Sequence, residues 1–205
     1  MFVVVEGIEG SGKSTLLSAL AERLRAGGRD VLTTREPGGT PVGDAIREIF
    51  LRRGLSICAM TESLLLNAAR AQHVAEVIRP ALEAGRMVLC DRFTDSTLAY
   101  QGYGRGADLE TLGAVCKIAT GGLEPDLVLQ LDIPVGVARE RLRGRRAATD
   151  RIEAEDDAFH ERVREGFRRL AGSPRHRILD AALPSARILE QALDEVKARL
   201  SLQAS

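Results

Sequence analysis

The chain has 205 residues, of which 44% are apolar and 28% are charged, with 29 basic and 29 acidic side chains. This length and apolar content fit one α/β domain over residues 1–205. The balanced charge excludes a global field that would recruit nucleic acid or a membrane surface. No apolar run approaches a membrane span, and the first one is too short for a signal peptide. We therefore expect a cytoplasmic protein that binds neither nucleic acid nor membrane.

The most informative stretch lies near the start of the chain. A mostly β-branched run at 2–5 predicts a buried strand, and apolar spacing over 15–24 before two glycines predicts a helix. Between them, G-I-E-G-S-G-K-S fits the phosphate-binding pattern G-x-x-x-x-G-K-[ST] in its required context. Glycines let backbone N–H groups curve around an anion, Lys13 can reach the β- and γ-phosphates, and Ser14 can ligate Mg²⁺. The residues expected to bind ATP are Gly7, Ile8, Glu9, Gly10, Ser11, Gly12, Lys13, Ser14 and Thr15.

A second strand is predicted over residues 30–34, followed by a loop rich in turn-forming residues. Loops that leave the carboxyl ends of parallel strands bind ligands in open α/β sheets. Arg35 and Glu36 are therefore candidate site residues, although solvated loop charges explain them equally well on pattern alone.

Two helices follow this loop. The first is predicted over residues 42–51, with Ile49 among its inward-facing residues and Arg47 on its surface when the helix is considered alone. The second is predicted over residues 62–78, with Thr61 as its N-cap.

Arg70 in the second helix occupies an unusual position. It shares one helical face with Leu66 and Val74 at four-residue spacing. An arginine between apolar residues either extends its charge to solvent or points its planar donor group into a pocket. We favour the pocket.

A third strand is predicted over residues 86–91, and it ends in Asp91. This arrangement is typical of the second acidic element of P-loop enzymes, which holds or orients Mg²⁺ beside the phosphates. Arg92 follows, where an acceptor phosphate could accept two parallel hydrogen bonds. Both tyrosines, Tyr100 and Tyr103, lie soon after it among hydrogen-bonding side chains, which suits a polar, planar ligand better than a core.

The rest of the chain continues the alternation of strands and helices. The helix at 154–170 is rich in paired acids and bases and is expected on the surface. The predicted fold is therefore α/β, a doubly wound, five-stranded and mostly parallel P-loop sheet with flanking helices. The remaining elements are expected at 109–120 (helix), 125–132 (strand), 135–143 (helix), 177–180 (strand) and 185–200 (helix).

The strongest local positive cluster runs from Arg139 to Arg151, around Gly144 and several small residues. Most charge runs are solvated helix faces. The alternative is a movable lid at about residues 143–152 that closes over transferring phosphates and supplies charge to them.

Taken together, these motifs resemble bacterial thymidylate kinases, and the similarity runs in order through nearly the whole chain. It is carried by the phosphate loop, by R-E-P-G-G-T at 35–40, by the run from Asp91 to Arg105 with its A-Y-Q-G, and by D-R-I-E at 150–153. The resemblance implies transfer of the γ-phosphoryl group of ATP to dTMP, giving dTDP and ADP for dTTP synthesis, with Mg²⁺ as cofactor. It also implies a homodimer that pairs through helices.

The resemblance also implies roles for individual residues. Arg92 and Arg47 would hold the acceptor phosphate, and Arg70 would donate to a thymine carbonyl. Tyr100 would crowd the sugar C2′ and so favour deoxyribose, while Thr97 and Gln101 would lie at the base edge. The other implied substrate-binding residues are Glu9, Arg35, Pro37, Leu66 and Ser96, and the implied metal-binding residues are Ser14, Glu9 and Asp91.

Two positions vary within this family. Gly10 and Ser11 stand where one branch carries an arginine, so the resemblance assigns the phosphate clamp to a lid arginine and leaves the choice open among Arg143, Arg145, Arg146 and Arg151. Leu66 stands where members commonly carry a phenylalanine that stacks on thymine. Such stacking is worth roughly 1–3 kcal/mol per base, and an aliphatic face recovers part of it by burial. We therefore expect activity with weaker dTMP affinity.

Two other functions fit the same phosphate loop. One is another nucleoside monophosphate or deoxynucleoside kinase of this fold, and a nucleoside acceptor would need a base to deprotonate its hydroxyl. The other is a P-loop regulatory NTPase, which would leave the arginine-rich segment without a purpose. The acceptor dTMP needs no catalytic base, because a phosphate monoester has its second pKa at about 6 and is mostly ionised at neutral pH.

Overall fold

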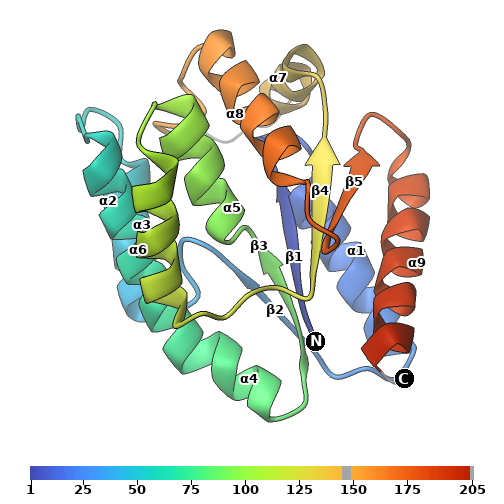
Figure 1. The fold of residues 1–205 in the computed structure, drawn as a ribbon. Coiled ribbons are helices and arrows are strands. Elements are labelled where there is room, and N and C mark those ends of the chain that lie inside the picture. Colours follow the sequence, from blue (N-terminus) through green and yellow to red (C-terminus); the bar gives the residue numbers. More distant parts are fainter. Residues whose placement is uncertain (145–148, 204–205) are drawn as a thin grey trace.

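The computed structural model describes residues 1–144 and 149–203, and they form a sheet with helices on both faces (Figure 1). The five strands lie in the order β2-β3-β1-β4-β5, and every neighbouring pair is parallel, so the sheet is parallel throughout rather than only mostly so. The strands are β1 (Phe2–Gly7), β2 (Val31–Arg35), β3 (Met87–Asp91), β4 (Leu127–Asp132) and β5 (His176–Asp180).

Helices cover the two faces of the sheet unequally (Figure 1). Helices α1 and α9 pack on one face, while α4, α5 and α8 pack on the other, and α2, α3 and α6 extend that second layer outward. The helices are α1 (Lys13–Ala26), α2 (Pro41–Leu51), α3 (Ala59–His73), α4 (Arg79–Glu83), α5 (Thr94–Thr97), α6 (Leu109–Thr120), α7 (Val135–Arg143), α8 (Asp157–Leu170) and α9 (Ser185–Gln203), with π-helical segments η1 (Val74–Ile78) and η2 (Leu98–Gly104).

The strands are buried on both faces, which is why their sequences are nearly all apolar. Alternate residues of β1 serve two clusters: Val3 packs in one with Leu20 of α1, and Val4 packs in the other with Ile78. Glu6 follows Val4 on the same side of the strand, because side chains alternate along a strand. It is the charged residue of this otherwise apolar strand and is fully buried.

The topology determines where a ligand can bind. From β1 the chain first builds β2 and β3 on one side and later β4 and β5 on the other. Open α/β sheets bind ligands outside the carboxyl ends of the strands at such a switch point. The phosphate loop follows β1 there, and Asp91 ends the neighbouring β3 opposite Val5.

The predicted strands and most predicted helices lie within a few residues of the observed ones, but two helix expectations are wrong. The helix predicted over 62–78 is instead α3 followed by the π-helical η1, and α3 begins after Cys58 rather than Thr61. Ile49 was expected to face inward and is 47% exposed. Phe50, which was also expected to face inward, is buried, because consecutive helical residues point about 100° apart and only one of the two faces the core.

The helix expected at the surface over residues 154–170 exposes most of its charged side chains, but one of its faces is buried. The helix is α8, and it packs against η2 and the sheet. Phe159, Val163 and Phe167 recur every fourth residue and are at most 3% exposed, so they form an apolar stripe. The many charged residues lie on the remaining faces of the helix. Amino-acid composition alone therefore does not indicate the apolar stripe.

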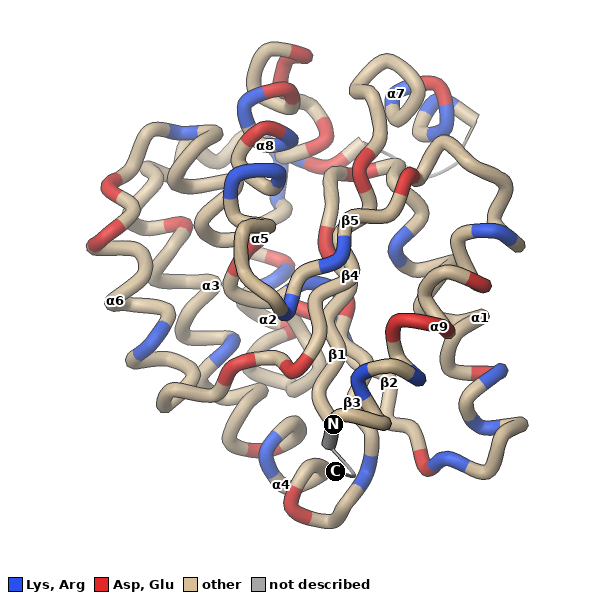
Figure 2. Tube along the Cα trace, turned by 45° about the vertical axis from the view of Figure 1, so that its right-hand side comes forward, with Lys and Arg blue, Asp and Glu red and all other residues tan. Residues whose placement is uncertain are grey.

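Basic and acidic residues are interspersed along the chain (Figure 2), in agreement with the 29 of each sign. Across the described residues, no helix combines the length and the apolar character that a bilayer crossing requires. Any anion site must therefore come from a local arrangement of side chains.

Candidate active site

A cavity of about 600 Å³ opens where the carboxyl ends of β1 and β3 meet the helical layer. The phosphate loop, α2, α3 and η2 all contribute to its walls. Three predicted loop residues, Gly7, Ile8 and Ser11, are buried beside it. The predicted residues that line it are Glu9, Gly10, Gly12, Lys13, Ser14, Thr15, Arg35, Glu36, Pro37, Arg47, Leu66, Arg70, Asp91, Arg92, Ser96, Thr97, Tyr100 and Gln101.

The phosphate loop is held in shape by close packing and by Lys13. Gly10 has φ 77°, and a Cβ there would lie 2.5 Å from the carbonyl oxygen of Ala138 in α7, so only glycine fits. Lys13 Nζ donates to the carbonyl oxygen of Ile8 at 2.9 Å. Burial, and then the nearby Arg92, lower the pKa of Lys13 to about 8. A bound phosphate would favour the charged form of this lysine.

A pair of oxygen ligands lies at the edge of the loop. Ser14 Oγ donates to Asp91 Oδ2 at 2.8 Å. Within the described ranges, no group of three or more His, Cys, Asp or Glu residues could hold a metal ion. Mg²⁺ is usually held by one or two carboxylates together with substrate phosphates and water. The pair therefore fits an Mg²⁺ ion that arrives with a nucleotide.

Arg92 reaches into the cavity from a strained backbone position. Its φ of 75° lies in the left-handed region that favours glycine. Its guanidinium donates to Glu9 Oε1 at 2.7 Å, to Ser96 Oγ at 3.0 Å and to Tyr100 Oη at 3.2 Å. Burial opposes ionisation of Glu9, but Arg92 and Lys13 outweigh it and lower the pKa of Glu9. Glu9, which was also expected near Mg²⁺, is thus engaged by Arg92.

Arg47 of α2 lies close to two other arginines. Its NH1 donates to the carbonyl oxygen of Pro37 at 3.1 Å. Burial, and then the charges of Arg35 and Arg92, lower the pKa of Arg47. In the part of the chain that the structure describes, no ion pair involves Arg47. These arginines repel one another, so an anion between them would be stabilised.

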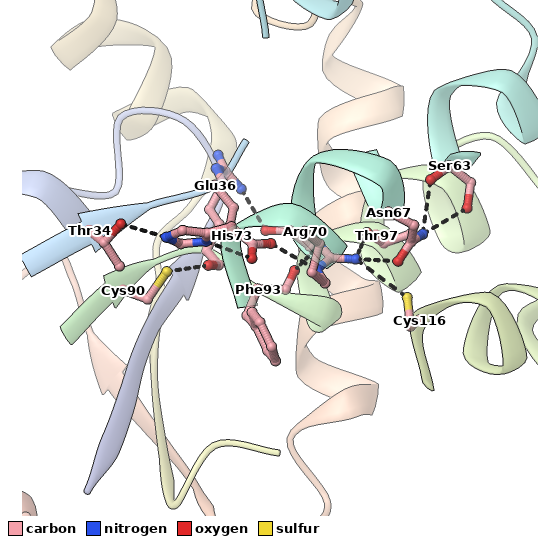
Figure 3. Close-up of polar contacts among 12 residues, drawn as sticks. Thr34, Glu36, Ser63, Asn67, Arg70, His73, Cys90, Phe93, Thr97 and Cys116 are labelled. Atoms are coloured by element: carbon pink, nitrogen blue, oxygen red, sulfur yellow. Dashed lines mark hydrogen bonds and ion pairs between the residues drawn. The ribbon is translucent and has the colours of Figure 1, made fainter. Parts of the chain in front are cut away.

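Arg70 is held in the cavity wall by a buried network (Figure 3). It is 2% exposed, and its Nε donates to Glu36 Oε2 at 2.7 Å. Its NH1 donates to Asn67 Oδ1 at 2.7 Å and to Thr97 Oγ1 at 3.1 Å, and its NH2 donates to the carbonyl oxygen of Phe93 at 3.0 Å. Burial opposes the charge of Arg70, but Glu36 raises its pKa. Arg70 is therefore fixed in one orientation with its charge compensated.

His73, one turn after Arg70, belongs to the same network and not to the cavity. It is fully buried, with Nε2 2.6 Å from Thr34 Oγ1 and Nδ1 3.2 Å from Glu36 Oε1 (Figure 3). Its two neighbours satisfy both ring nitrogens, so it is a structural histidine.

The remaining wall combines apolar and amide groups. Leu66 lies one helical turn before Arg70 and is 9% exposed. Gln101 Nε2 donates to Glu62 Oε2 at 2.8 Å, while its Oε1 has no hydrogen-bond partner among the described residues. Tyr103 lies outside the cavity, contrary to expectation, because it packs against Gly166 of α8, where a Cβ would lie 2.7 Å from its ring.

The arginine-rich segment is only partly described. Arg145 and Arg146 lie outside the described residues, and Arg143 is exposed at the end of α7. Arg151 Nε donates to the carbonyl oxygen of Phe50 at 2.9 Å, and its NH1 donates to Glu62 Oε1. Arg151 thus anchors the carboxyl end of this segment to α2 and α3.

Several residues of the site were not singled out from the sequence. Arg141 and Asp150 line the cavity, and Asp150 Oδ1 accepts the backbone N–H of Ile152 at 2.9 Å. The only sequence signals for these two residues were the arginine cluster for Arg141 and the D-R-I-E run for Asp150. Glu62 is fully buried and accepts hydrogen bonds from Gln101, Arg105 and Arg151, which no local pattern indicates.

Comparisons with known proteins relate the whole chain to one family. A family model described as thymidylate kinase matches residues 5–192. The chain is 51% identical over 210 residues to a thymidylate kinase of Desulfovibrio desulfuricans, with 98% of this chain and 96% of that protein covered. It is 52% identical over 205 residues to one of Pseudomonas fluorescens, with the same coverage. A crystal structure of thymidylate kinase from Ehrlichia chaffeensis matches with a TM-score of 0.76 and 31% identity, covering 96% of this chain and 98% of that chain. The chain belongs to the thymidylate kinase family.

Proposed function

We propose that this chain transfers the γ-phosphoryl group of ATP to dTMP in the cytoplasm, giving dTDP and ADP. The observation that carries the proposal is the single cavity that joins the phosphate loop to Arg47, Arg92 and Arg70. Phosphoryl transfer depends mainly on alignment of donor and acceptor and on neutralisation of charge. One cavity with an anion site at each of two walls meets both requirements.

On the donor side, the loop glycines bind the phosphates of ATP and Lys13 neutralises them. Ser14 and Asp91 would hold Mg²⁺, which fits their paired oxygens. The bound ion would neutralise phosphate charge beside the loop. The buried position of Lys13 makes its interaction with the transferred group stronger than it would be in water.

On the acceptor side, Arg92 and Arg47 bind the phosphate of dTMP. Arg47 lies near Arg92 and makes no ion pair with a carboxylate among the described residues, which supports this assignment. The acceptor oxygen is already ionised, so Asp91 need not take a proton. Arg35, Pro37 and Ser96 complete this wall.

The base and the sugar contact the wall of α3 and η2. Arg70 makes five hydrogen bonds within the described residues, and three of them come from NH1. One N–H of NH2 is left, and Arg70 donates this group to a thymine carbonyl. Thr97 and Gln101 lie at the base edge, and Leu66 covers its face. Tyr100 crowds the sugar C2′ and so disfavours ribose.

The segment at about residues 143–152 acts as the lid, and its arginines neutralise the transferring phosphate. Arg143, Arg145 and Arg146 are the candidates for this role. Arg151 is held by Glu62 and the carbonyl of Phe50, so we assign it to anchoring the lid.

We also propose a homodimer formed through the outer helical layer. Leu64 of α3 is 53% exposed and Ile118 of α6 is 81% exposed, and Ile49 of α2 is 47% exposed. These three helices are neighbours in one layer (Figure 1). A second copy of the chain would remove these apolar side chains from water.

The test is ADP release with Mg-ATP against dTMP, dUMP, ribose TMP, dCMP and thymidine. We expect release that depends on dTMP and is strongly reduced with ribose TMP. Release with thymidine but not with dTMP would identify a nucleoside kinase. Release without any acceptor would identify an NTPase.

A further inference from the structure

Glu6 is a buried carboxylate that none of the assigned roles uses. It lies at the end of β1, immediately before the phosphate loop, and is 0% exposed. Its Oε1 accepts the backbone N–H of Phe93 at 2.8 Å and of Ser96 at 3.2 Å. Its Oε2 accepts Ser96 Oγ at 2.6 Å. Glu6 therefore binds donors at the start of α5 that the helix itself leaves free.

Ser96 connects this carboxylate to Arg92. A serine hydroxyl has one proton to donate, and here the proton goes to Glu6, so the oxygen is left as an acceptor. Arg92 NH1 donates to that oxygen at 3.0 Å. The chain of contacts runs from Glu6 through Ser96 to the guanidinium in the cavity.

The backbone of Arg92 depends on the same strand. Its N–H donates to the carbonyl oxygen of Val5 at 3.0 Å, while Glu6 binds the next N–H, that of Phe93. Arg92 has φ 75°, which is unfavourable for a residue with a side chain. Such a conformation persists only where its surroundings hold it, and β1 supplies contacts on both sides of it.

We propose that Glu6 is a positioning residue for the acceptor phosphate, acting through Ser96 to hold Arg92 in the conformation that grips it. This inference rests on the proposed kinase function. Glu6 touches neither nucleotide, so its effect should fall on the affinity for dTMP and spare the affinity for ATP.

The ionisation of Glu6 provides an independent readout. Burial, and then the charge of Asp95, raise the pKa of Glu6 to about 7, although Arg92 and the hydrogen bonds from the Ser96 hydroxyl and the Phe93 backbone oppose this. Asp95 is itself bound by His176 Nε2 at 2.7 Å. The charged and titratable groups whose fields reach Glu6 are Asp95, Arg92, Lys13, Arg70 and Cys90. Protonation of Glu6 removes the acceptor of the Ser96 proton, so dTMP should bind less well below about pH 7.

The experiment compares Glu6→Gln and Ser96→Ala with the wild-type chain. The control is Gln130→Leu, because Gln130 lies opposite Glu6 in β4 and is equally buried at 2% exposed. Wild-type ADP release with Mg-ATP and dTMP is measured first, and its absence would overturn the proposed function rather than the role of Glu6. Thermal unfolding establishes that each variant is folded.

We expect Glu6→Gln and Ser96→Ala each to raise the KM for dTMP about tenfold, because each substitution removes one charge-assisted hydrogen bond from the network that holds Arg92. The KM for ATP should change less than about twofold, and Gln130→Leu should change neither. The KM of the double variant for dTMP should be no higher than that of the more impaired single variant, because both substitutions act through one chain of contacts. An unchanged KM for dTMP, or equal increases for both substrates, would overturn the proposal.

The pH profile of kcat/KM for dTMP separates positioning from a merely structural role. The phosphate of dTMP titrates at about pH 6 in every variant. The wild type should show an additional loss near pH 7 that Glu6→Gln lacks. Superimposable profiles for the two proteins would refute the role of Glu6.

Discussion

Replacing Glu6 with Gln should stabilise the fold above pH 7, even though it weakens dTMP binding. The carboxylate is 0% exposed, and its hydrogen-bond donors Phe93 and Ser96 are neutral. Keeping a charge in such a place costs free energy, and the neutral amide of glutamine removes that cost. The function of the site and the stability of the fold therefore oppose each other at this residue.

The size of the effect follows from the pKa of Glu6. Burial, and then Asp95, raise it from the ordinary 4.5 to about 7 in the folded chain. Between these values the folded state keeps a proton that the unfolded state has released, so the contribution is fully present below pH 4.5 and is lost as the pH rises through 7. Each pKa unit corresponds to about 1.4 kcal/mol, which gives a loss of about 3 kcal/mol in the free energy of unfolding.

The assay is urea unfolding of the wild type and Glu6→Gln at several pH values from 4.5 to 8. In the difference between the free energies of unfolding of the two proteins, the contributions of all other titrating groups cancel. It should grow by about 3 kcal/mol in favour of Glu6→Gln across this range, while Gln130→Leu should show no such trend. A difference that stays constant with pH would refute the reasoning, because the carboxylate would then not be a charge held at a cost.

Three further predictions concern the other walls of the cavity and the outer helices. Leu66→Phe should lower the KM for dTMP about tenfold, since aromatic stacking on a base contributes roughly 1–3 kcal/mol; an unchanged KM would show that the leucine already fills this wall. Ser14→Ala should raise the Mg²⁺ concentration for half-maximal activity about tenfold, because Asp91 alone then supplies a protein oxygen; a superimposable Mg²⁺ titration would contradict the metal assignment. Ile118→Asp should convert a dimer to a monomer in sedimentation velocity with unchanged circular dichroism, and a monomeric wild type would exclude the dimer.

The parts of the fold that depend on local sequence were predictable. The strand, glycine loop and helix over residues 2–26 need only neighbouring residues, and they appear as predicted. The parallel strands could be predicted as continuous apolar runs, because both of their faces are buried. The missed amphipathic character of α8 was also present in the sequence, since Phe159, Val163 and Phe167 recur at helical spacing. Because many residues of that helix are charged, its overall composition is that of an exposed helix, and only the spacing indicates a buried face.

The candidate site was predictable only where a motif or a resemblance named its residues. The partners of those residues come from distant parts of the chain. Glu6 contacts Ser96 across 90 residues, and Glu62 contacts Arg151 across 89. No periodicity or local spacing connects such pairs, because a buried carboxylate gives the same sequence signal as an exposed one. Only the folded arrangement shows that both carboxylates are buried and satisfied.

The contacts of Glu62 also bear on which lid arginine could bind the transferring phosphate. It is fully buried and accepts hydrogen bonds from Gln101, Arg105 and Arg151, which come from the base-binding wall and from the carboxyl end of the lid. If Arg151 left Glu62 to reach a phosphate, a buried carboxylate would lose a charged donor, at a cost of about 1.5–3 kcal/mol. The same departure would loosen Gln101, which needs Glu62 to fix its amide. A clamp that weakened base recognition each time it closed would hinder phosphoryl transfer. We therefore propose that the clamp is Arg143, Arg145 or Arg146, and that Arg151 anchors the lid.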